Sequence, residues 1–270
     1  MLQGFISAGY RPGFQTFHPD PQINFQFNRW LPFMDRAEVE EVAKHIHNLA
    51  DWKRELAQLG DTANADERYL HASTYYRAAE FFMVGEEPFR ASLNTKALVS
   101  FDRALAHLPI ERHEVSYGKS TLPALCMRAR GLRRDTLVIH GGFDSCKEEY
   151  IAAAPDYADR GIDVVIFDGP GQGQALRQQG LAMDVEWEKP VGAVLDHFAI
   201  NSCTLMGFSL GGYLAPRAAA FDDRIVRVIA DDVLMDFFSA FTGKAGSTMP
   251  QTLEDLLAAG DRQRVMGRSS

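Results

Sequence analysis

A serine flanked by glycines is the residue of this sequence best suited to chemistry. Residues 207–212 read GFSLGG, between a β-rich run at 203–208 and a helical run at 211–221. This G-x-S-x-G spacing is typical of a catalytic serine, because the strand-to-helix turn is too tight for side chains at the flanking positions. The hydroxyl of Ser209 would project at a helix N-terminus, where free N–H groups favour developing negative charge. The pattern predicts that Ser209 is a nucleophile; the alternative is a glycine-rich turn with an incidental serine.

A second glycine-rich loop, HGGFDS at 140–145, follows the β-rich run DTLVIH. In hydrolases with this arrangement, the loop supplies one backbone N–H to an oxyanion hole, and the residue after the nucleophile supplies the other. The first donor would be the N–H of Phe143 or of Gly142, and the second would be that of Leu210. These amides are the predicted oxyanion donors.

The same loop offers contacts to a substrate. Glycine lets the main chain approach a ligand closely, so Gly141 and Gly142, together with Phe208 beside the serine, are the expected substrate-binding residues. His140 starts the loop, and we expect it to be a structural hydrogen-bonding residue rather than a proton carrier.

A third loop, DGPGQG at 168–173, has no nucleotide signature. A dinucleotide fingerprint would need glycine where Gln174 stands, and no phosphate-binding P-loop motif occurs in the chain. The loop is expected to be a structural turn beside the active site, with ligand contact as the alternative. His45 and His47 lie two apart in a predicted helix and would point about 200° apart, so they cannot share a metal ion. The sequence predicts no cofactor and no metal.

These loops belong to a strand-and-helix pattern that begins at residue 113. Several β-rich runs are apolar on both faces, as strands covered by helices on both sides must be. Alternation with helical segments predicts an α/β fold with a mostly parallel sheet. The predicted strands are HEVSY at 113, PALCMRA at 123, DTLVIH at 135, DVVIFDG at 163, CTLMGF at 203 and RVIAD at 227, and the predicted helices span about 147–160, 185–199 and 211–221.

The chain before this pattern is predicted to be helical. Apolar spacing behind a capping box at Asp35 and Glu38 indicates one helix that ends at Gly60, and further helices are expected over 66–83 and 93–108. Residues 1–33 carry many aromatic side chains without a regular period, which favours an extended arm. We therefore divide the chain into an aromatic arm with a helical domain at 1–112 and an α/β domain at 113–270.

Four of these segments together resemble a known family. The HGG loop, the DGPGQG turn, the GFSLGGYLAPRAAA elbow and the YYRAAEFFM helix look like the α/β-hydrolases that include 2,6-dihydroxypseudooxynicotine hydrolase and the fungal yellowish-green pigment hydrolases. The resemblance covers about 30–240. It implies a helical N-terminal lid over an α/β-hydrolase sheet, Ser209 as nucleophile, and Phe143 and Leu210 as oxyanion donors. It also implies cleavage of a carbon–carbon bond in a diketone-like or polyketide substrate of a pigment or secondary-metabolite pathway.

The chain departs from this family in one respect. Family members place an acid and a histidine after the serine, but no histidine follows His197 here, and we expect the last two strands of the sheet to be missing. Three explanations stay open: the chain is part of a longer protein, it recruits His18, His113 or His140, or it binds without catalysing. Three acids, Asp231, Asp232 and Asp236, could orient a histidine, although strand-end and helix-cap roles are the simpler interpretation.

Composition limits the partners. The 270 residues carry a formal charge of −8, which gives no net attraction for nucleic acid or anionic lipid. There is no secretory pattern, no apolar run of about 18 residues, and an odd number of cysteines, so we expect a cytoplasmic protein with free thiols. A sheet edge left unpaired would favour a homodimer. The expected ligand is a small hydrophobic substrate, and a carboxylesterase and an inactive ligand- or partner-binding homologue are the alternative functions.

Overall fold

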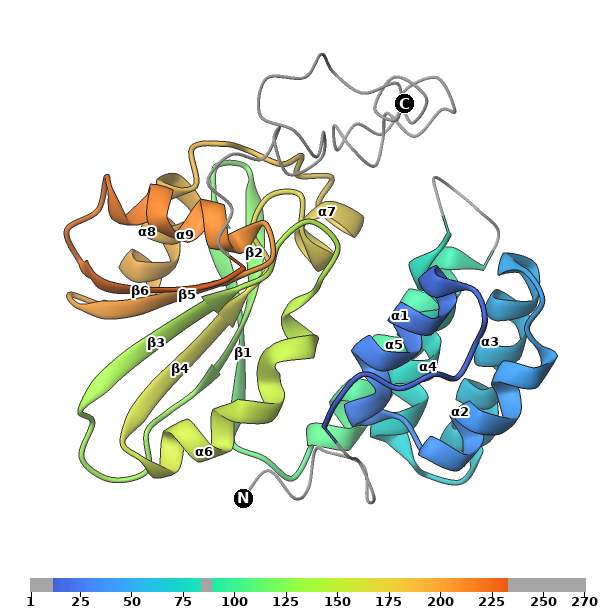
Figure 1. Cartoon of the computed structure of the whole chain (residues 1–270). Coiled ribbons are helices and arrows are strands. Elements are labelled where there is room, and N and C mark those ends of the chain that lie inside the picture. The colour runs from blue at the N-terminus through green and yellow to red at the C-terminus, as the bar shows by residue number, and fades with distance from the viewer. Residues whose placement is uncertain (1–11, 84–88, 233–270) are drawn as a thin grey trace, which may run out of the picture. The chain divides into compact units, whose positions relative to one another are not determined.

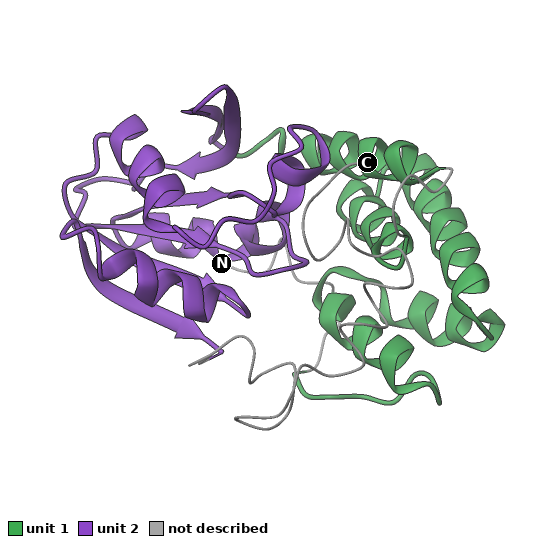
Figure 2. Ribbon diagram, turned by 90° about the horizontal axis from the view of Figure 1, so that it is seen from above, with its two compact units in different colours: residues 1–108 green, residues 109–270 purple. Residues whose placement is uncertain are grey.

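The computed structural model describes residues 12–83 and 89–232 of the chain. It divides into two compact units, Met1–Leu108 and Pro109–Ser270, coloured separately in Figure 2. The division falls slightly before the boundary that we placed between residues 112 and 113.

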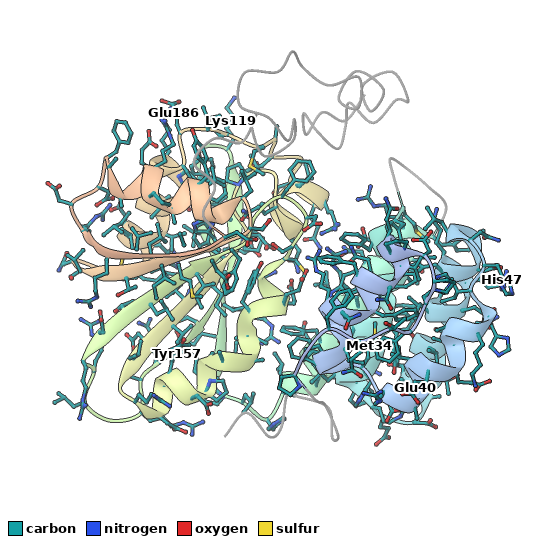
Figure 3. The ribbon with its side chains drawn as sticks, viewed as in Figure 1. Met34, Glu40, His47, Lys119, Tyr157 and Glu186 are labelled. Atoms are coloured by element: carbon teal, nitrogen blue, oxygen red, sulfur yellow. The ribbon has the colours of Figure 1, made fainter. Side chains whose placement is uncertain are left out.

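The first unit is helical (Figure 1). Its elements are α1 (Pro21–Trp30), the 3-10 helix η2 (Leu31–Phe33), α2 (Arg36–Val42), the 3-10 helix η3 (Ala43–His45), α3 (Leu49–Ala65), α4 (Tyr69–Phe81) and α5 (Arg90–Leu105). Their apolar faces share one core, in which Met34 is fully buried, whereas the side chains of Glu40 and His47 point outward (Figure 3). The helices expected over 66–83 and 93–108 correspond to α4 and α5.

The prediction of an extended arm is wrong for the described part of residues 1–33. Asp20 caps helix α1 by accepting hydrogen bonds from the N–H groups of Gln22 and Ile23, and Pro21 occupies the first turn, where a missing N–H costs nothing. Phe27 and Trp30 are buried in the helical core. Phe27 and Trp30 thus lie on the buried face of a capped helix, whereas Phe25 of the same helix is exposed. Residues 1–11 lie outside the described part of the chain.

The single helix predicted to end at Gly60 is two helices. Asp35 caps α2 as predicted, but α2 ends at Val42, and Asn48 starts α3 by accepting from the N–H groups of Ala50 and Asp51. Gly60 lies inside α3, where a Cβ atom would come within 2.5 Å of the Tyr76 ring on α4. The glycine therefore allows two helices to approach closely and does not end one.

The second unit contains a six-stranded sheet with the order β1-β2-β4-β3-β5-β6. Strands β3 to β6 pair in parallel, and β1 and β2 join through antiparallel pairs. The strands are β1 (Ile110–Tyr117), β2 (Ser120–Met127), β3 (Asp135–His140), β4 (Ile162–Phe167), β5 (Cys203–Phe208) and β6 (Ile225–Asp231). All six expected strands are present, and the expected α/β fold with a mostly parallel sheet is confirmed.

Helices cover both faces of this sheet, as the apolar strands require. Figure 1 shows α8 (Glu188–His197) and α9 (Gly211–Ala219) on one face and α6 (Ala154–Asp159) on the other. The 3-10 helix η4 (Lys147–Ala153) precedes α6, and the short α7 (Gly173–Arg177) follows β4. Strands β3, β4 and β5 are buried along most of their length.

Strand β6 differs from the interior strands. Val226, Val228 and Ile229 are exposed, although the strand pairs with β5 along its length. The expectation that two further strands are missing concerns residues 233–270, which lie outside the described residues. Within residues 12–83 and 89–232, no helix has the length and apolar character needed to cross a bilayer.

Candidate active site

Ser209 occupies a strained turn between β5 and α9. Its φ is 56°, in the left-handed region that non-glycine residues rarely adopt. Two backbone hydrogen bonds hold the turn: the Ser209 N–H donates to the Asp231 carbonyl oxygen at 2.8 Å, and the Gly212 N–H donates to the Ser209 carbonyl oxygen at 2.8 Å. The serine is therefore fixed on a tight strand-to-helix bend, as the motif predicts.

The glycines around Ser209 leave space that a side chain would fill. A Cβ at Gly207 would lie 2.0 Å from the Gly211 carbonyl oxygen, and one at Gly212 would lie 1.7 Å from the Asp232 carbonyl oxygen. Both distances are far below van der Waals contact, so neither position accepts alanine without backbone movement. The glycine spacing in the sequence thus has a direct steric cause.

The side chain of Ser209 is accessible. The residue is exposed, and within the described residues nothing hydrogen-bonds to its hydroxyl. Phe208 beside it is half-buried and stacks on Tyr150 of η4, with ring centroids 4.4 Å apart and an interplanar angle of 18°. A hydroxyl in this position can reach a substrate, and an aromatic pair lies next to it.

The HGGFDS loop lies against the serine turn. A Cβ at Gly142 would come within 2.7 Å of the Leu210 nitrogen and 2.9 Å of the Ser209 Cβ. The Gly142 N–H donates to the Ser145 hydroxyl at 3.1 Å and so is already engaged. Neither the Phe143 N–H nor the Leu210 N–H has a hydrogen-bond acceptor among the described residues. Of the two donors considered for this loop, the geometry favours Phe143 over Gly142.

Gly141 is buried behind Gly142. Its carbonyl oxygen accepts hydrogen bonds, and a Cβ at this position would lie 2.1 Å from the Ser145 hydroxyl oxygen. The glycine therefore permits Ser145 to reach the Gly142 N–H.

His140 has the structural role expected of it. It is fully buried; its Nδ1 lies 2.9 Å from the Gly141 carbonyl oxygen, and the Trp187 indole N–H donates to its Nε2 at 3.2 Å. These contacts require the neutral ring with the proton on Nδ1, since Nε2 must accept. Burial lowers the pKa of His140 to about 4. Both ring nitrogens are engaged, so His140 is not available to Ser209 as a base.

The other two histidines that could have been recruited are also engaged. His113 on β1 lies 3.1 Å from His197 and 3.2 Å from Glu111, measured between side-chain nitrogen or oxygen atoms. The strand register places His113 four strands from Gly207, or roughly 19 Å at about 4.8 Å per strand. His18, in the helical unit, contacts the Ile46 carbonyl oxygen and accepts from the Asp20 N–H.

The three acids are divided between described and undescribed residues. Asp231 pairs with Phe208 across β5 and β6, and Asp232 has a φ of 79° directly after β6; both are exposed. Asp236 lies outside the described residues.

The DGPGQG turn is anchored by buried charges. Asp168 accepts from the backbone N–H groups of Lys147 and Gln174 at 2.8 and 3.0 Å. The Lys147 ammonium lies 2.6 Å from Glu148 and 3.4 Å from Asp168. Burial by itself would lower the pKa of Lys147, but the two carboxylates raise it. The turn is thus a rigid structural element, in line with the sequence-based interpretation.

The cysteines are packed inside the described part of the chain. All three are free and buried. Burial raises the pKa of Cys126 to about 12 and that of Cys203 to about 11, which keeps both as thiols at neutral pH.

Sequence reasoning did not single out four side chains that hold this site together. They are Ser145, Tyr150, Gln172 and Trp187. Ser145 and Gln172 lie inside the HGGFDS and DGPGQG motifs, so the sequence placed both residues near the site. It did not indicate their hydrogen-bond partners. Tyr150 and Trp187 lie in runs with no motif, and only tertiary packing reveals them.

Comparison with known proteins gives a consistent picture. A family model described as "alpha/beta hydrolase fold" matches residues 136–265. The chain is 34% identical over 220 residues to "Hydrolase LUC6" of Fusarium sp, covering 73% of this chain and 51% of that protein. It is also 34% identical over 260 residues to "20-hydroxy-prefusarin hydrolase FUS2" of Gibberella moniliformis, covering 80% of this chain and 61% of that protein.

A solved structure agrees in fold. The crystal structure of 2,6-dihydroxy-pseudo-oxynicotine hydrolase superposes with a TM-score of 0.63 at 21% identity, covering 91% of this chain and 71% of that one. By contrast, the chain spans only about half to three-fifths of the length of the two fungal relatives.

Proposed function

Because the chain belongs to the α/β-hydrolase family, we propose that it acts as a serine hydrolase with Ser209 as its nucleophile. The observation that carries the proposal is the strained, exposed Ser209 beside two backbone N–H groups, of Phe143 and Leu210, that lack acceptors among the described residues. Such donors stabilise the negative charge that develops on the substrate oxygen in the transition state. In many acyl-transfer enzymes this stabilisation is the largest single contribution to the rate enhancement.

The reaction would proceed by attack of the Ser209 oxygen on a substrate carbonyl carbon. The carbonyl oxygen would become an oxyanion facing the Phe143 and Leu210 N–H groups, while the serine proton passes to a base. In a β-diketone, collapse of this intermediate breaks the carbon–carbon bond and releases an enolate, which takes up a proton. Water then hydrolyses the acyl-serine, so that diketone plus water gives an acid and a ketone.

Two features support a polyketide-like substrate of a secondary-metabolite pathway. The motifs resemble those of hydrolases that cleave diketones, and the curated relatives include a fungal protein named as a 20-hydroxy-prefusarin hydrolase. The aromatic pair Phe208 and Tyr150 beside the serine would suit an apolar substrate.

A second candidate function is binding without turnover. In favour of this candidate, the described contacts place no histidine of the α/β unit beside Ser209: both ring nitrogens of His140 are hydrogen-bonded, and His113 on β1 contacts His197 on α8. Without a histidine base, a serine enzyme loses about 10⁶ in turnover, and binding with the oxyanion hole leaves only about 10³ to 10⁴ over water.

The test measures the full chain with two substrates, p-nitrophenyl butyrate and 1-phenyl-1,3-butanedione. Ser209→Ala removes the nucleophile, and Ser202→Ala, at an exposed serine just before β5, is the matched control. We expect diketone cleavage in wild type and in the control, with a loss of the order of 10⁴ to 10⁶ in Ser209→Ala.

The outcomes separate the candidates. Serine-dependent turnover of the ester without the diketone would indicate a carboxylesterase. Equal, background-level rates in all three proteins, with saturable binding of the diketone, would indicate a binding protein and would contradict the hydrolase.

A further inference from the structure

We propose that Gln172 of the DGPGQG turn is a positioning residue that aims the Phe143 N–H into the oxyanion hole. The inference rests on the proposed function, because the Phe143 N–H is one of the two oxyanion donors in that function and Gln172 is inferred to set its direction. Gln172 would act through the Gly142 carbonyl and need not touch substrate.

The contacts of Gln172 are all with backbone. Its side chain is almost fully buried, with 1% exposed. Its amide nitrogen donates to the Gly141 carbonyl oxygen at 2.7 Å and to the Gly142 carbonyl oxygen at 2.9 Å. Its amide oxygen accepts from the Gly169 N–H at 3.0 Å. Only one orientation of the amide fits two acceptors and one donor, so the direction of the side chain is fixed by its partners.

The peptide between Gly142 and Phe143 connects the Gln172 contact to the Phe143 N–H. The Gly142 carbonyl and the Phe143 N–H belong to one trans peptide, in which the two groups point in opposite directions. The described residues contain no cis peptide bond. Holding the oxygen toward Gln172 therefore turns the Phe143 N–H away from Gln172, on the side opposite the DGPGQG turn.

Gln172 acts almost alone on this peptide. The preceding Gly141–Gly142 peptide is held at both ends, because His140 and Gln172 contact its oxygen and Ser145 accepts from its N–H. Among the described residues, the Gly142 carbonyl oxygen has Gln172 as its side-chain donor, and the Phe143 N–H has no acceptor. Two adjacent glycines permit many backbone conformations, so the external donor selects one of them.

The support for Gln172 is rigid. It lies between Asp168, whose carboxylate binds two backbone N–H groups, and α7, whose first residue Gly173 would clash with Asp168 at 2.2 Å if it had a Cβ. A rigid second layer is what holds catalytic donors in their productive geometry.

The test compares three variants of the full chain. Gln172→Ala removes the donor, and Gln172→Glu keeps the shape but replaces the donating nitrogen by an oxygen. Gln174→Ala is the matched control, because Gln174 lies two residues further on in α7 and its side chain contacts Glu148 and not the HGGFDS loop. Two readouts are made: kcat and KM on p-nitrophenyl butyrate, and the ¹⁵N-Phe spectrum, in which the Phe143 signal is assigned by its loss in Phe143→Leu.

We expect kcat to fall about 10²-fold in Gln172→Ala with KM little changed, since losing one oxyanion donor costs about 10² to 10³ in kcat. The Phe143 amide signal shifts in this variant and not in Gln174→Ala. For Gln172→Glu, activity relative to wild type rises as the pH is lowered from 8 to 5.5, because a protonated carboxyl regains one donor. A merely structural role would not produce this recovery.

Three results would overturn the inference. They are an unchanged Phe143 signal in Gln172→Ala, an unchanged kcat despite a shifted signal, and equal losses in Gln172→Ala and Gln174→Ala. If wild-type turnover does not depend on Ser209, the proposed function fails instead, and the Phe143 signal alone then decides whether Gln172 orients the peptide. Should Gln172→Ala not fold, Gln172→Glu provides the same readouts in a side chain of equal size.

Discussion

The N–H of Ser209 donates to the carbonyl oxygen of Asp231 at 2.8 Å, so the strained serine turn is tied to the last residue of β6. The neighbouring Phe208 pairs with the same Asp231 in the parallel register of β5 and β6. Strand β6 thus supports the serine turn from one side. The HGGFDS loop contacts the same turn at Gly142. The geometry of the nucleophile therefore depends on two neighbouring segments as well as on the motif itself.

Gly142→Ala should lower activity strongly by displacing the backbone where the HGGFDS loop meets the serine turn. The new Cβ would point at the Leu210 nitrogen and the Ser209 Cβ, at 2.7 and 2.9 Å, and would fill the space that the oxyanion needs. We expect kcat on p-nitrophenyl butyrate to fall by about 10² to 10³, as on loss of an oxyanion donor.

The control for this prediction is Gly192→Ala on α8, where a Cβ would meet only ordinary contacts at 3.6 Å or more. It should retain wild-type kcat. Wild-type activity in Gly142→Ala would show that the oxyanion does not lie between these two segments.

Gly60→Ala should destabilise the protein, although the same change usually strengthens a helix. Alanine in a helix interior gains about 0.5–1 kcal/mol over glycine. Here the Cβ would come within 2.5 Å of the Tyr76 ring, which the Asp61 carboxylate holds through the Tyr76 hydroxyl at 2.7 Å. Overpacking costs about 1–3 kcal/mol, so we expect a net loss of roughly 1–2 kcal/mol in urea unfolding.

Gly192→Ala should instead stabilise the protein, because the new Cβ would meet only ordinary contacts and the helix propensity of alanine is higher than that of glycine. A gain of about 0.5–1 kcal/mol is expected. If both substitutions stabilise the protein, the approach of α3 and α4 at Gly60 is not close enough to exclude a Cβ atom.

Acidification should destabilise the protein through His140. Burial lowers its pKa to about 4 in the folded state, against 6.5 when unfolded, so the unfolded chain binds more protons in this interval. Stability from this group is therefore complete above pH 6.5 and is lost as the pH falls toward 4. The loss amounts to about 3 kcal/mol over the interval.

His140→Gln removes the titrating group, and His47→Gln removes an exposed histidine as its control. Urea unfolding at pH 7 and pH 5 should show a smaller pH effect in His140→Gln than in wild type, and the wild-type effect in His47→Gln. The same pH dependence in all three proteins would contradict the structural role of His140.

Ser145→Ala should cost stability more than activity. The buried Ser145 hydroxyl accepts the Gly142 N–H at 3.1 Å, and its loss leaves a buried donor without a partner, at about 1–3 kcal/mol. Because the Phe143 and Leu210 donors remain, kcat should fall less than in Gly142→Ala. The exposed Ser116→Ala provides the baseline for unfolding; equal unfolding free energies in the two variants would show that the hydroxyl does not hold the loop.

The parts of this structure that follow from local rules were predictable from the sequence. The β-rich runs located all six strands, and the glycine spacing placed Ser209 on its turn, because both depend on residues near in the chain. The missed features depend on long-range packing. Gly60 lies inside α3, and the reason for a glycine there is the ring of Tyr76, which another helix contributes. Gln172 has no visible role until the fold brings it to Gly142.

The proposed anion-stabilising groups are main-chain amides, which every residue except proline carries. The side chain of Leu210 lies in the hydrophobic core of the α/β unit and that of Phe143 packs against this core, so exchanging either one would change packing without removing a donor. The requirement for one particular residue type therefore falls on the amide, hydroxyl and glycine positions that orient the main chain: Gln172, Ser145 and Gly142.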